Sequence, residues 1–339
     1  MEGFLDQVIA AARERVRVRQ KIKPLALLQA EWPARLARTM GDQAPTGQTD
    51  LTIRPIEQVD LTKGPDAGVA MAVKTNLREA GQPKGPNKEL KPNDELKNNG
   101  LGPSSAPPLT PGERFLSRLS KPGLCLIAEI KRASPSRGVL ASGLSAEDQG
   151  RLYARAGARA ISVLTEEKYF QGRLSDLTAV AHSVSLPVLR KDFIIDPYQI
   201  WESAHAGAHA ILLIVRVLGP QLPHFMAECR KVGLAALVET HTAPEVELAL
   251  ASGAQIIGVN CRDLNTLTLD PARHQELRRL IPPGIRTVAE SGIHHREEVQ
   301  ALAAQGYDAI LVGESLITAP DPAAKIAELL GGIRYNGLD

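Results

Sequence analysis

The sequence predicts a (β/α)8 barrel, because residues 112–332 repeat one pattern eight times. Each repeat begins with a short apolar run rich in β-branched residues and continues with a segment of helical periodicity. The runs are almost continuously apolar, as expected for parallel strands buried on both faces. They are LCLIAEIK (124–131), ARAISVLTE (158–166), LPVLRKDF (186–193), AHAILLIV (208–215), LAALVETH (234–241), AQIIGVNC (254–261), IRTVAES (285–291) and YDAILVGES (307–315).

The number of runs favours a closed barrel over an open, doubly wound sheet. Open sheets of that kind usually have five or six strands and a glycine-rich turn after the first. Neither GxGxxG nor GxxxxGK[ST] occurs in this chain. Several runs follow a glycine, as in AGARA, AGAHA, SGAQI and QGYDA, which is typical of a helix that ends just before the next strand.

The first 110 residues do not follow this pattern. Residues 3–38 are expected to form helices, broken in two at Pro24, because apolar residues recur there at helical spacing. Residues 41–110 contain no Phe, Tyr or Trp and are dense in Gly, Pro, Asn and Lys, so we expect a disordered insertion. The predicted organisation is N-terminal helices packing on the barrel (1–40), a low-complexity insertion (41–110) and a barrel catalytic domain (111–339).

Composition narrows the classes of protein further. The formal net charge is +2, without the basic patch that a nucleic-acid or membrane-surface partner would require. The three cysteines are far apart and suggest neither a disulfide framework nor a cysteine-rich metal site. No signal peptide and no apolar stretch long enough to span a membrane is apparent. We therefore expect a cytoplasmic protein.

Polar or charged side chains end nearly every apolar run. In a (β/α)8 barrel the carboxyl ends of the strands face the active site. Any one of these side chains could be an ordinary strand-to-loop transition, but the whole set predicts acid–base chemistry. Glu129 and Lys131 share one face of their strand, because side chains alternate along it. The set comprises Glu129, Lys131, Thr165, Glu166, Arg190, Lys191, Asp192, Glu239, His241, Asn260, Arg262, Glu290, Ser291, Gly313, Glu314 and Ser315.

The last two runs carry a second signal. AESGI (289–293) and LVGESLI (311–317) each place Gly and Ser just after a strand. Barrels of this class often bind phosphate with the loops after strands seven and eight. A phosphorylated small molecule is therefore the expected substrate, and a tight strand-to-helix turn is the plainer alternative.

The chain resembles the indole-3-glycerol-phosphate synthase family of tryptophan biosynthesis. The resemblance covers residues 112–332, with a weaker match over 3–38. It rests on seven motifs that occur in the family's order. They are LIAEIKRASPSRG (126–138), ISVLTEEKYFQG (161–172), PVLRKDFIIDPYQI (187–200), LVETHT (237–242), GVNCRDL (258–264), AESGI and DAILVGESL (308–316).

The resemblance implies a reaction without cofactor or metal. The substrate, 1-(2-carboxyphenylamino)-1-deoxyribulose 5-phosphate, closes its pyrrole ring, loses CO2 and water, and yields indole-3-glycerol phosphate. A cation must protonate the ketose carbonyl during ring closure. A carboxylate must take up a proton in the dehydration.

The resemblance also implies roles for individual residues. Lys191 is the general acid and Glu239 the general base. Lys131 is a second lysine that binds an anion and donates a proton in a later step, with Glu129 as its charge partner, and Asn260 positions the intermediate. Substrate-binding residues are Ser134 and Arg262 for the carboxylate, Glu290 and Ser291 at the hydroxyl end, Gly292, Gly313 and Ser315 for the phosphate, and Phe193 and Phe170 around the aromatic ring.

The chain departs from the family at two places. Cys261 stands where the family commonly has a second Asn, and it alternates away from Asn260, so we expect little effect on chemistry. The 41–110 insertion replaces a short connection near the barrel mouth.

The chain is expected to act as a monomer. Association with other enzymes of tryptophan biosynthesis is left open. The alternative function, phosphoribosylanthranilate isomerase, would need a Cys/Asp acid–base pair, whereas the strand ends here offer Lys and Glu.

Overall fold

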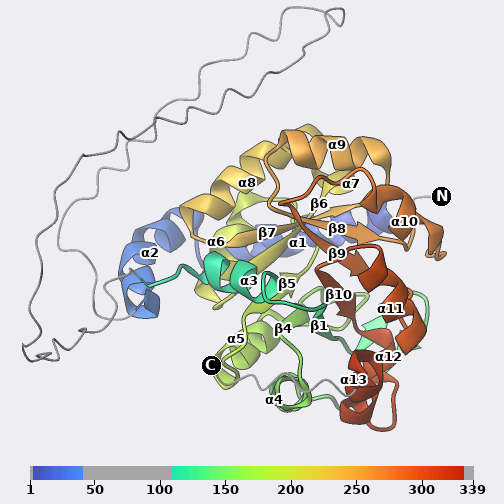
Figure 1. Ribbon diagram of the computed structural model, residues 1–339. Helices are drawn as coiled ribbons and strands as arrows, with labels where there is room; N and C mark the ends of the chain where they lie inside the picture. The colour runs from blue at the N-terminus through green and yellow to red at the C-terminus, as the bar shows by residue number, and fades with distance from the viewer. Residues whose placement is uncertain (1–2, 41–107, 332–339) are drawn as a thin grey trace, which may run out of the picture. The chain divides into compact units, whose positions relative to one another are not determined.

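A computed structural model describes residues 3–40 and 108–331 of the chain. Eight parallel strands close into a barrel in the order β1-β10-β9-β8-β7-β6-β5-β4 (Figure 1). Every run predicted as a strand forms one, so the (β/α)8 prediction is confirmed. The strands are β1 (Cys125–Ile130), β4 (Ala160–Leu164), β5 (Val188–Lys191), β6 (Ala210–Ile214), β7 (Ala235–Thr240), β8 (Ile256–Asn260), β9 (Arg286–Glu290) and β10 (Ala309–Val312).

Helices surround the barrel and follow the strands in turn (Figure 1). Local sequence signals set their ends: Asp196 and Asp321 cap helix N-termini, and the lead-in glycines Gly157, Gly207, Gly253 and Gly306 have positive φ. The helices after the first strand are α4 (Ala146–Ala156), α5 (Leu174–Ser183), α6 (Pro197–His205), α7 (Val215–Leu218), α8 (Leu222–Lys231), α9 (Ala243–Ala251), α10 (Ala272–Arg278), α11 (Arg296–Ala304), α12 (Glu314–Ile317) and α13 (Pro322–Leu330). A short hairpin, β2 (Ala133–Ser134) with β3 (Gly138–Val139), lies in the loop after β1.

Alternation along the strands creates two apolar cores. One set of strand side chains packs outward against the helices, and the other set fills the barrel lumen. On β1, Leu126 and Ala128 belong to the outer core, whereas Cys125 and Ile127 belong to the lumen. Glu129 continues the lumen series, and so do Lys191 after Leu189 and Glu239 after Leu237. The polar strand ends are therefore the upper layer of a packed interior.

Three helices precede the first strand of the barrel. They are α1 (Phe4–Ile22), α2 (Leu25–Met40) and α3 (Pro111–Leu119). In Figure 1, α3 crosses in front of the strands and α1 lies behind them. Phe115 of α3 and Val8 of α1 both belong to the lumen core, and Trp32 of α2 packs against His205 of α6 at 5.5 Å between ring centroids. The break expected at Pro24 falls between α1 and α2.

The predicted disorder of 41–110 concerns residues that lie almost wholly outside the described ones. The division of the chain into 1–40, 41–110 and 111–339 stays a prediction. In the parts of the chain that the structure describes, no helix is both long enough and apolar enough to cross a membrane.

Candidate active site

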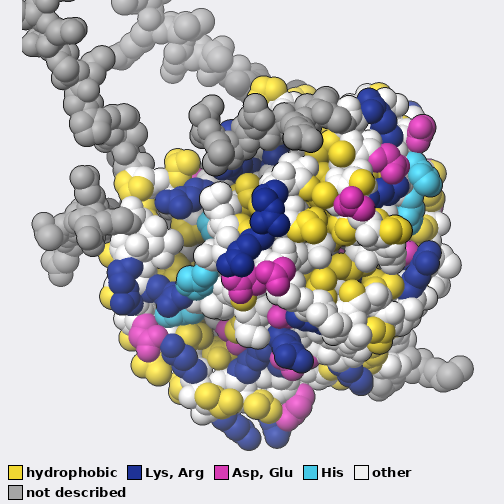
Figure 2. All heavy atoms as spheres, turned by 90° about the horizontal axis from the view of Figure 1, so that it is seen from below, with side chains coloured by type: hydrophobic (Ala, Val, Ile, Leu, Met, Phe, Trp, Pro, Cys, Tyr) yellow, Lys and Arg dark blue, Asp and Glu magenta, His cyan; other side chains and the backbone are white. Residues whose placement is uncertain are grey.

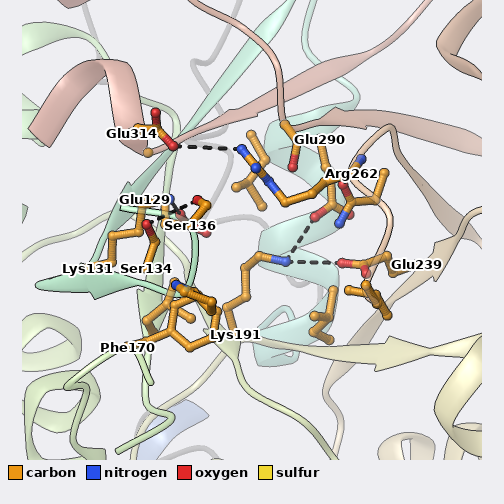
Figure 3. Close-up of a pocket in the computed structure, with 18 of the residues that line it drawn as sticks. Glu129, Lys131, Ser134, Ser136, Phe170, Lys191, Glu239, Arg262, Glu290 and Glu314 are labelled. Carbon is orange, nitrogen blue, oxygen red and sulfur yellow. Dashed lines mark hydrogen bonds and ion pairs between the residues drawn. The ribbon is translucent and has the colours of Figure 1, made fainter. Parts of the chain in front are cut away.

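The carboxyl ends of the barrel strands enclose one pocket (Figure 3). Thirteen of the fourteen residues predicted for the site line it, although they lie far apart in the sequence. They are Glu129, Lys131, Ser134, Phe170, Lys191, Phe193, Glu239, Asn260, Arg262, Glu290, Ser291, Gly292 and Gly313. Ser315 is the exception: its hydroxyl donates to the carbonyl of Ile293, at 2.9 Å, instead of facing the pocket.

Lys191 is the centre of the charged cluster. Its Nζ lies 3.1 Å from Oε2 of Glu239 and 3.0 Å from Oε2 of Glu290, and Figure 3 shows it pointing toward both carboxylates. Both carboxyl side chains are only 1% exposed. Glu239 approaches from β7 and Glu290 from β9, so the convergence depends on barrel closure.

The single ammonium group of Lys191 contacts two buried carboxyl groups. One positive charge cannot stabilise two negative charges equally, so the pKa values of Glu239 and Glu290 differ. Burial would lower the pKa of Lys191, but the charges of Glu239 and Glu290 outweigh it and raise that pKa above its ordinary value. Burial would raise the pKa of Glu239, but Lys191 and His241 lower it below the ordinary value. Burial raises the pKa of Glu290 to about 8, against the effect of Lys191 and with the help of Glu239. At pH 7 the cluster therefore holds a protonated lysine, an ionised Glu239 and a protonated Glu290.

Two glycines make room for the carboxyl groups. A Cβ on Gly258 would lie 2.2 Å from Oε1 of Glu290, and a Cβ on Gly313 would lie 2.3 Å from Oε1 of Glu129. Gly258 is on β8, which pairs with the strand of Glu290, and Gly313 directly follows β10, which pairs with the strand of Glu129. Gly313, predicted for phosphate, thus also accommodates an acidic side chain.

Glu129 and Lys131 form the ion pair expected from their shared face. Nζ of Lys131 lies 2.8 Å from Oε1 of Glu129, and both side chains are nearly buried. The hairpin that follows brings Ser134, Pro135 and Ser136 to the pocket wall. This pair stands on the side of the pocket away from Glu239 in Figure 3.

The sequence did not identify Glu314 and Arg137 as a pair at the pocket mouth. Oε1 of Glu314 lies 2.8 Å from Nε of Arg137, and Oε2 lies 3.7 Å from Nη2 of Arg262. Arg262 also donates to the carbonyl of Leu267 at 3.0 Å. Arg262 therefore lines the pocket, and Arg137 is linked to it through Glu314. The signal available in the sequence was the charge of Arg137 beside the SPS motif.

The opposite wall of the pocket is apolar. Phe170 and Phe193 lie 6.5 Å apart between ring centroids, with Leu212 and Ile214 also lining the wall. Phe4 reaches the pocket from α1, where it packs edge-on against Tyr169 at 5.1 Å. Sequence reasoning missed Phe4, because helical spacing shows an apolar face but not the element that it covers.

The turn after β9 is sharp. Ser291 and Gly292 both have φ of 69°, a conformation that only glycine adopts without cost. The Cβ that Gly292 lacks would lie 3.1 Å from Sγ of Cys261. Cys261 is fully buried and is not among the residues that line the pocket, and burial raises its pKa to about 11.

Behind Lys191, its two neighbours in the chain anchor β5 to α1. Arg190 is fully buried and donates to Asp192 at 3.1 Å, and Nη2 of Arg15 lies 2.6 Å from the other oxygen of Asp192. Thr165 donates to the same carboxylate at 2.6 Å. Burial would raise the pKa of Asp192, but Arg15 and Arg190 lower it. The backbone that presents Lys191 is thus fixed on both sides.

Comparison with known proteins assigns the pocket to a family. The family model described as indole-3-glycerol phosphate synthase matches residues 103–329. The chain belongs to that family. An indole-3-glycerol phosphate synthase of Syntrophobacter fumaroxidans is 48% identical over 219 residues, 64% of this chain and 83% of its own length. One of Dehalococcoides mccartyi is 50% identical over 209 residues, 60% of this chain and 81% of its own length.

The family is one of carboxy-lyases in tryptophan biosynthesis, so the chain is an enzyme of that type acting on a small phosphorylated substrate. Phosphoribosylanthranilate isomerase is not favoured. Among solved structures, 3-hexulose-6-phosphate synthase from Salmonella typhimurium superposes with a TM-score of 0.50 at 15% identity, over 62% of this chain and 98% of that one. That likeness concerns the fold. Within residues 3–40 and 108–331, no group of three or more His, Cys, Asp or Glu side chains could hold a metal ion.

Proposed function

We propose that this pocket closes the pyrrole ring of 1-(2-carboxyphenylamino)-1-deoxyribulose 5-phosphate, with Lys191 as general acid and Glu239 as general base. The observation that carries the proposal is the position of Lys191. Its ammonium lies between two buried carboxyl groups and beside an apolar wall. A protonated lysine in such a site can give its proton to a ketose oxygen, and the nearby carboxylate lowers the barrier by taking one up.

The division of protonation states supports these roles. Lys191 holds a proton at neutral pH because its pKa is raised, so it can act first as an acid. Glu239 is ionised because its pKa is lowered, so it can accept a proton in the dehydration. Asn260 lines the same wall of the pocket and would orient the hydroxyl that leaves. Lys131, paired with Glu129, would supply the second cation.

The two ends of the pocket suit the two ends of the substrate. The aromatic ring would lie against Phe170 and Phe193, and the carboxylate would meet Arg262 and Ser134. The phosphate would bind at the turns after β9 and β10, where Ser291, Gly292 and Gly313 line the pocket. Ser315 would donate its backbone N–H to the phosphate, because its hydroxyl already donates to the carbonyl of Ile293.

A fluorescence assay for indole-3-glycerol phosphate tests this proposal. The full-length chain should form the product, and Lys191→Ala should lower turnover by about 10²–10⁴-fold, the usual contribution of a general acid. Lys231→Ala is the matched control, since Lys231 pairs with Glu228 on the outer helix α8 and lies outside the pocket. Absence of product from the wild-type chain, or near-normal turnover of a folded Lys191→Ala variant, would refute the proposal.

We also propose that one chain acts alone in the cytoplasm. Figure 2 shows basic, acidic and apolar side chains interspersed on one face of the molecule. Light scattering coupled to size-exclusion chromatography should give a mass of one chain, and mixing with purified enzymes of tryptophan biosynthesis would reveal any association.

A further inference from the structure

His241 lies behind Glu239 and takes no part in the proposed acid–base steps. It follows β7 directly, and its side chain is 0% exposed. Its Nε2 lies 3.3 Å from Oε1 of Glu239, and its Nδ1 lies 3.4 Å from Oε2 of Glu245. A fully buried imidazole thus stands between two carboxylates, one of which faces the pocket.

The polar atoms at this contact are otherwise without hydrogen bonds. Among the described residues, neither ring nitrogen of His241 nor Oε1 of Glu239 has a partner in good hydrogen-bond geometry. A buried polar atom left unpaired is destabilising, and few are found in folded proteins. Catalytic hydrogen bonds are often long before the substrate binds and shorten in the complex. His241 and Glu239 are therefore placed to complete each other's hydrogen bonding.

The two oxygens of Glu239 have different neighbours. Oε2 faces Lys191 at 3.1 Å, and Oε1 faces His241. A contact on each oxygen fixes the plane of the carboxylate as well as its distance from the reacting atoms. Both neighbours of the imidazole are carboxylate oxygens, which accept hydrogen bonds from a ring N–H.

His241 is itself held from outside the barrel. Its backbone N–H donates to Oε2 of Glu245 at 2.6 Å, in the first turn of α9. Oε1 of Glu245 accepts from Arg216 at 3.3 Å, and Arg216 also donates to Asp263 at 3.3 Å. Contacts from α7, α9 and the loop after β8 thus support the ring against Glu239.

We propose that His241 is a positioning residue that holds the carboxylate of Glu239 in the orientation needed for proton uptake and favours its ionised form. The proposal rests on the assignment of Glu239 as general base. The groups that face Glu239 are Lys191 from β5, Asn260 from β8, Glu290 from β9 and His241 itself. Of these, Lys191 and His241 lower its pKa by their charge and Asn260 by a hydrogen bond, so removal of the imidazole should raise that pKa.

Two substitutions of His241 separate its contact with Glu239, through Nε2, from its contact with Glu245, through Nδ1. In His241→Gln the side-chain amide reaches the position of Nε2 and can still donate to Glu239. In His241→Asn the amide reaches only the position of Nδ1, so the donor to Glu239 is lost while that to Glu245 is kept. We expect His241→Asn to lower kcat by about tenfold and to move the acid limb of the kcat/KM profile up by about one pH unit, with a smaller effect on KM. His241→Gln should stay within about threefold of the wild type.

His209→Asn is the matched control. His209 is another largely buried histidine, which accepts a hydrogen bond from the backbone of Val188 and lies outside the pocket. This variant should show the pH profile of the wild type. If His241→Asn and His241→Gln lose activity equally, with the acid limb unmoved and thermal stability reduced, the residue is only structural and the proposal fails.

A second measurement does not depend on turnover. The 15N resonances of the His241 ring should shift in Glu239→Gln, because the carboxylate that they face becomes an amide, and unchanged resonances would overturn the inference. Absence of product from the wild-type chain would refute the proposed function, and this inference with it. Product formation with a wild-type pH profile in His241→Asn would refute the inference alone.

Discussion

Glu290 gives the sharpest test of the electrostatics of the site. Its pKa is raised from 4.5 to about 8, chiefly by burial. Between those two pH values the folded protein keeps the proton while the unfolded chain releases it. The contribution of Glu290 to stability is therefore complete below pH 4.5 and falls as pH rises toward 8, by about 1.4 kcal/mol per pH unit. From pH 5 to pH 8 the loss is on the order of 4 kcal/mol.

Glu290→Gln should remove this loss. A glutamine has the shape of the protonated carboxyl group and its carbonyl can still accept from Lys191, but it cannot ionise. Urea unfolding at pH 5, 6, 7 and 8 should show the variant gaining stability relative to the wild type, by on the order of 4 kcal/mol across the series. Glu328→Gln, at a half-exposed position on α13, is the control and should run parallel to the wild type. A stability difference between Glu290→Gln and the wild type that stays constant with pH would refute the reasoning.

Three further outcomes follow from the same contacts. Glu239→Gln should lower turnover by about 10²–10⁴-fold in the product assay, whereas the exposed Glu247→Gln should not, and equal activities would remove the base assignment. Arg15→Met should lower the free energy of unfolding, measured in urea, by about 3 kcal/mol, because the buried carboxylate of Asp192 loses one of its two arginines. Arg17→Met, at an exposed position, is the control. A loss below about 1 kcal/mol in Arg15→Met would contradict the buried ion pair. A thiol reagent should react with Cys125, Cys229 and Cys261 only after unfolding, since burial raises the pKa of each thiol to about 11 or 12. Fast labelling of the native protein would contradict this.

The barrel could be predicted because its signals are local. An apolar run with a polar end shows a buried parallel strand, and the period of two puts Glu129 and Lys131 on one face. Closure of the sheet then brings the strand ends together, so Lys191 and Glu239 meet although neither is near the other in the sequence. The family resemblance supplied the chemical roles that periodicity does not encode.

The remaining features depend on register and on contacts between distant elements. That Gly258 makes room for Glu290 follows only from the pairing of β8 with β9. That Phe4 lines the pocket depends on where α1 docks, and that docking uses Arg15 against Asp192. Ser315 was placed correctly after β10, but the direction of its hydroxyl is decided by the carbonyl of Ile293 on another loop.

The protonation of Glu290 has a consequence for how the site receives its substrate. With Glu290 neutral, the cationic and anionic groups deep in the pocket balance: Lys131 pairs with Glu129 and Lys191 with Glu239. A balanced interior adds little net attraction for a substrate with two anionic groups. We propose that the attraction comes from Arg262 and from the backbone N–H groups of the turns after β9 and β10. On this proposal, substitutions at Arg262 should act mainly on KM and substitutions at Lys191 mainly on kcat.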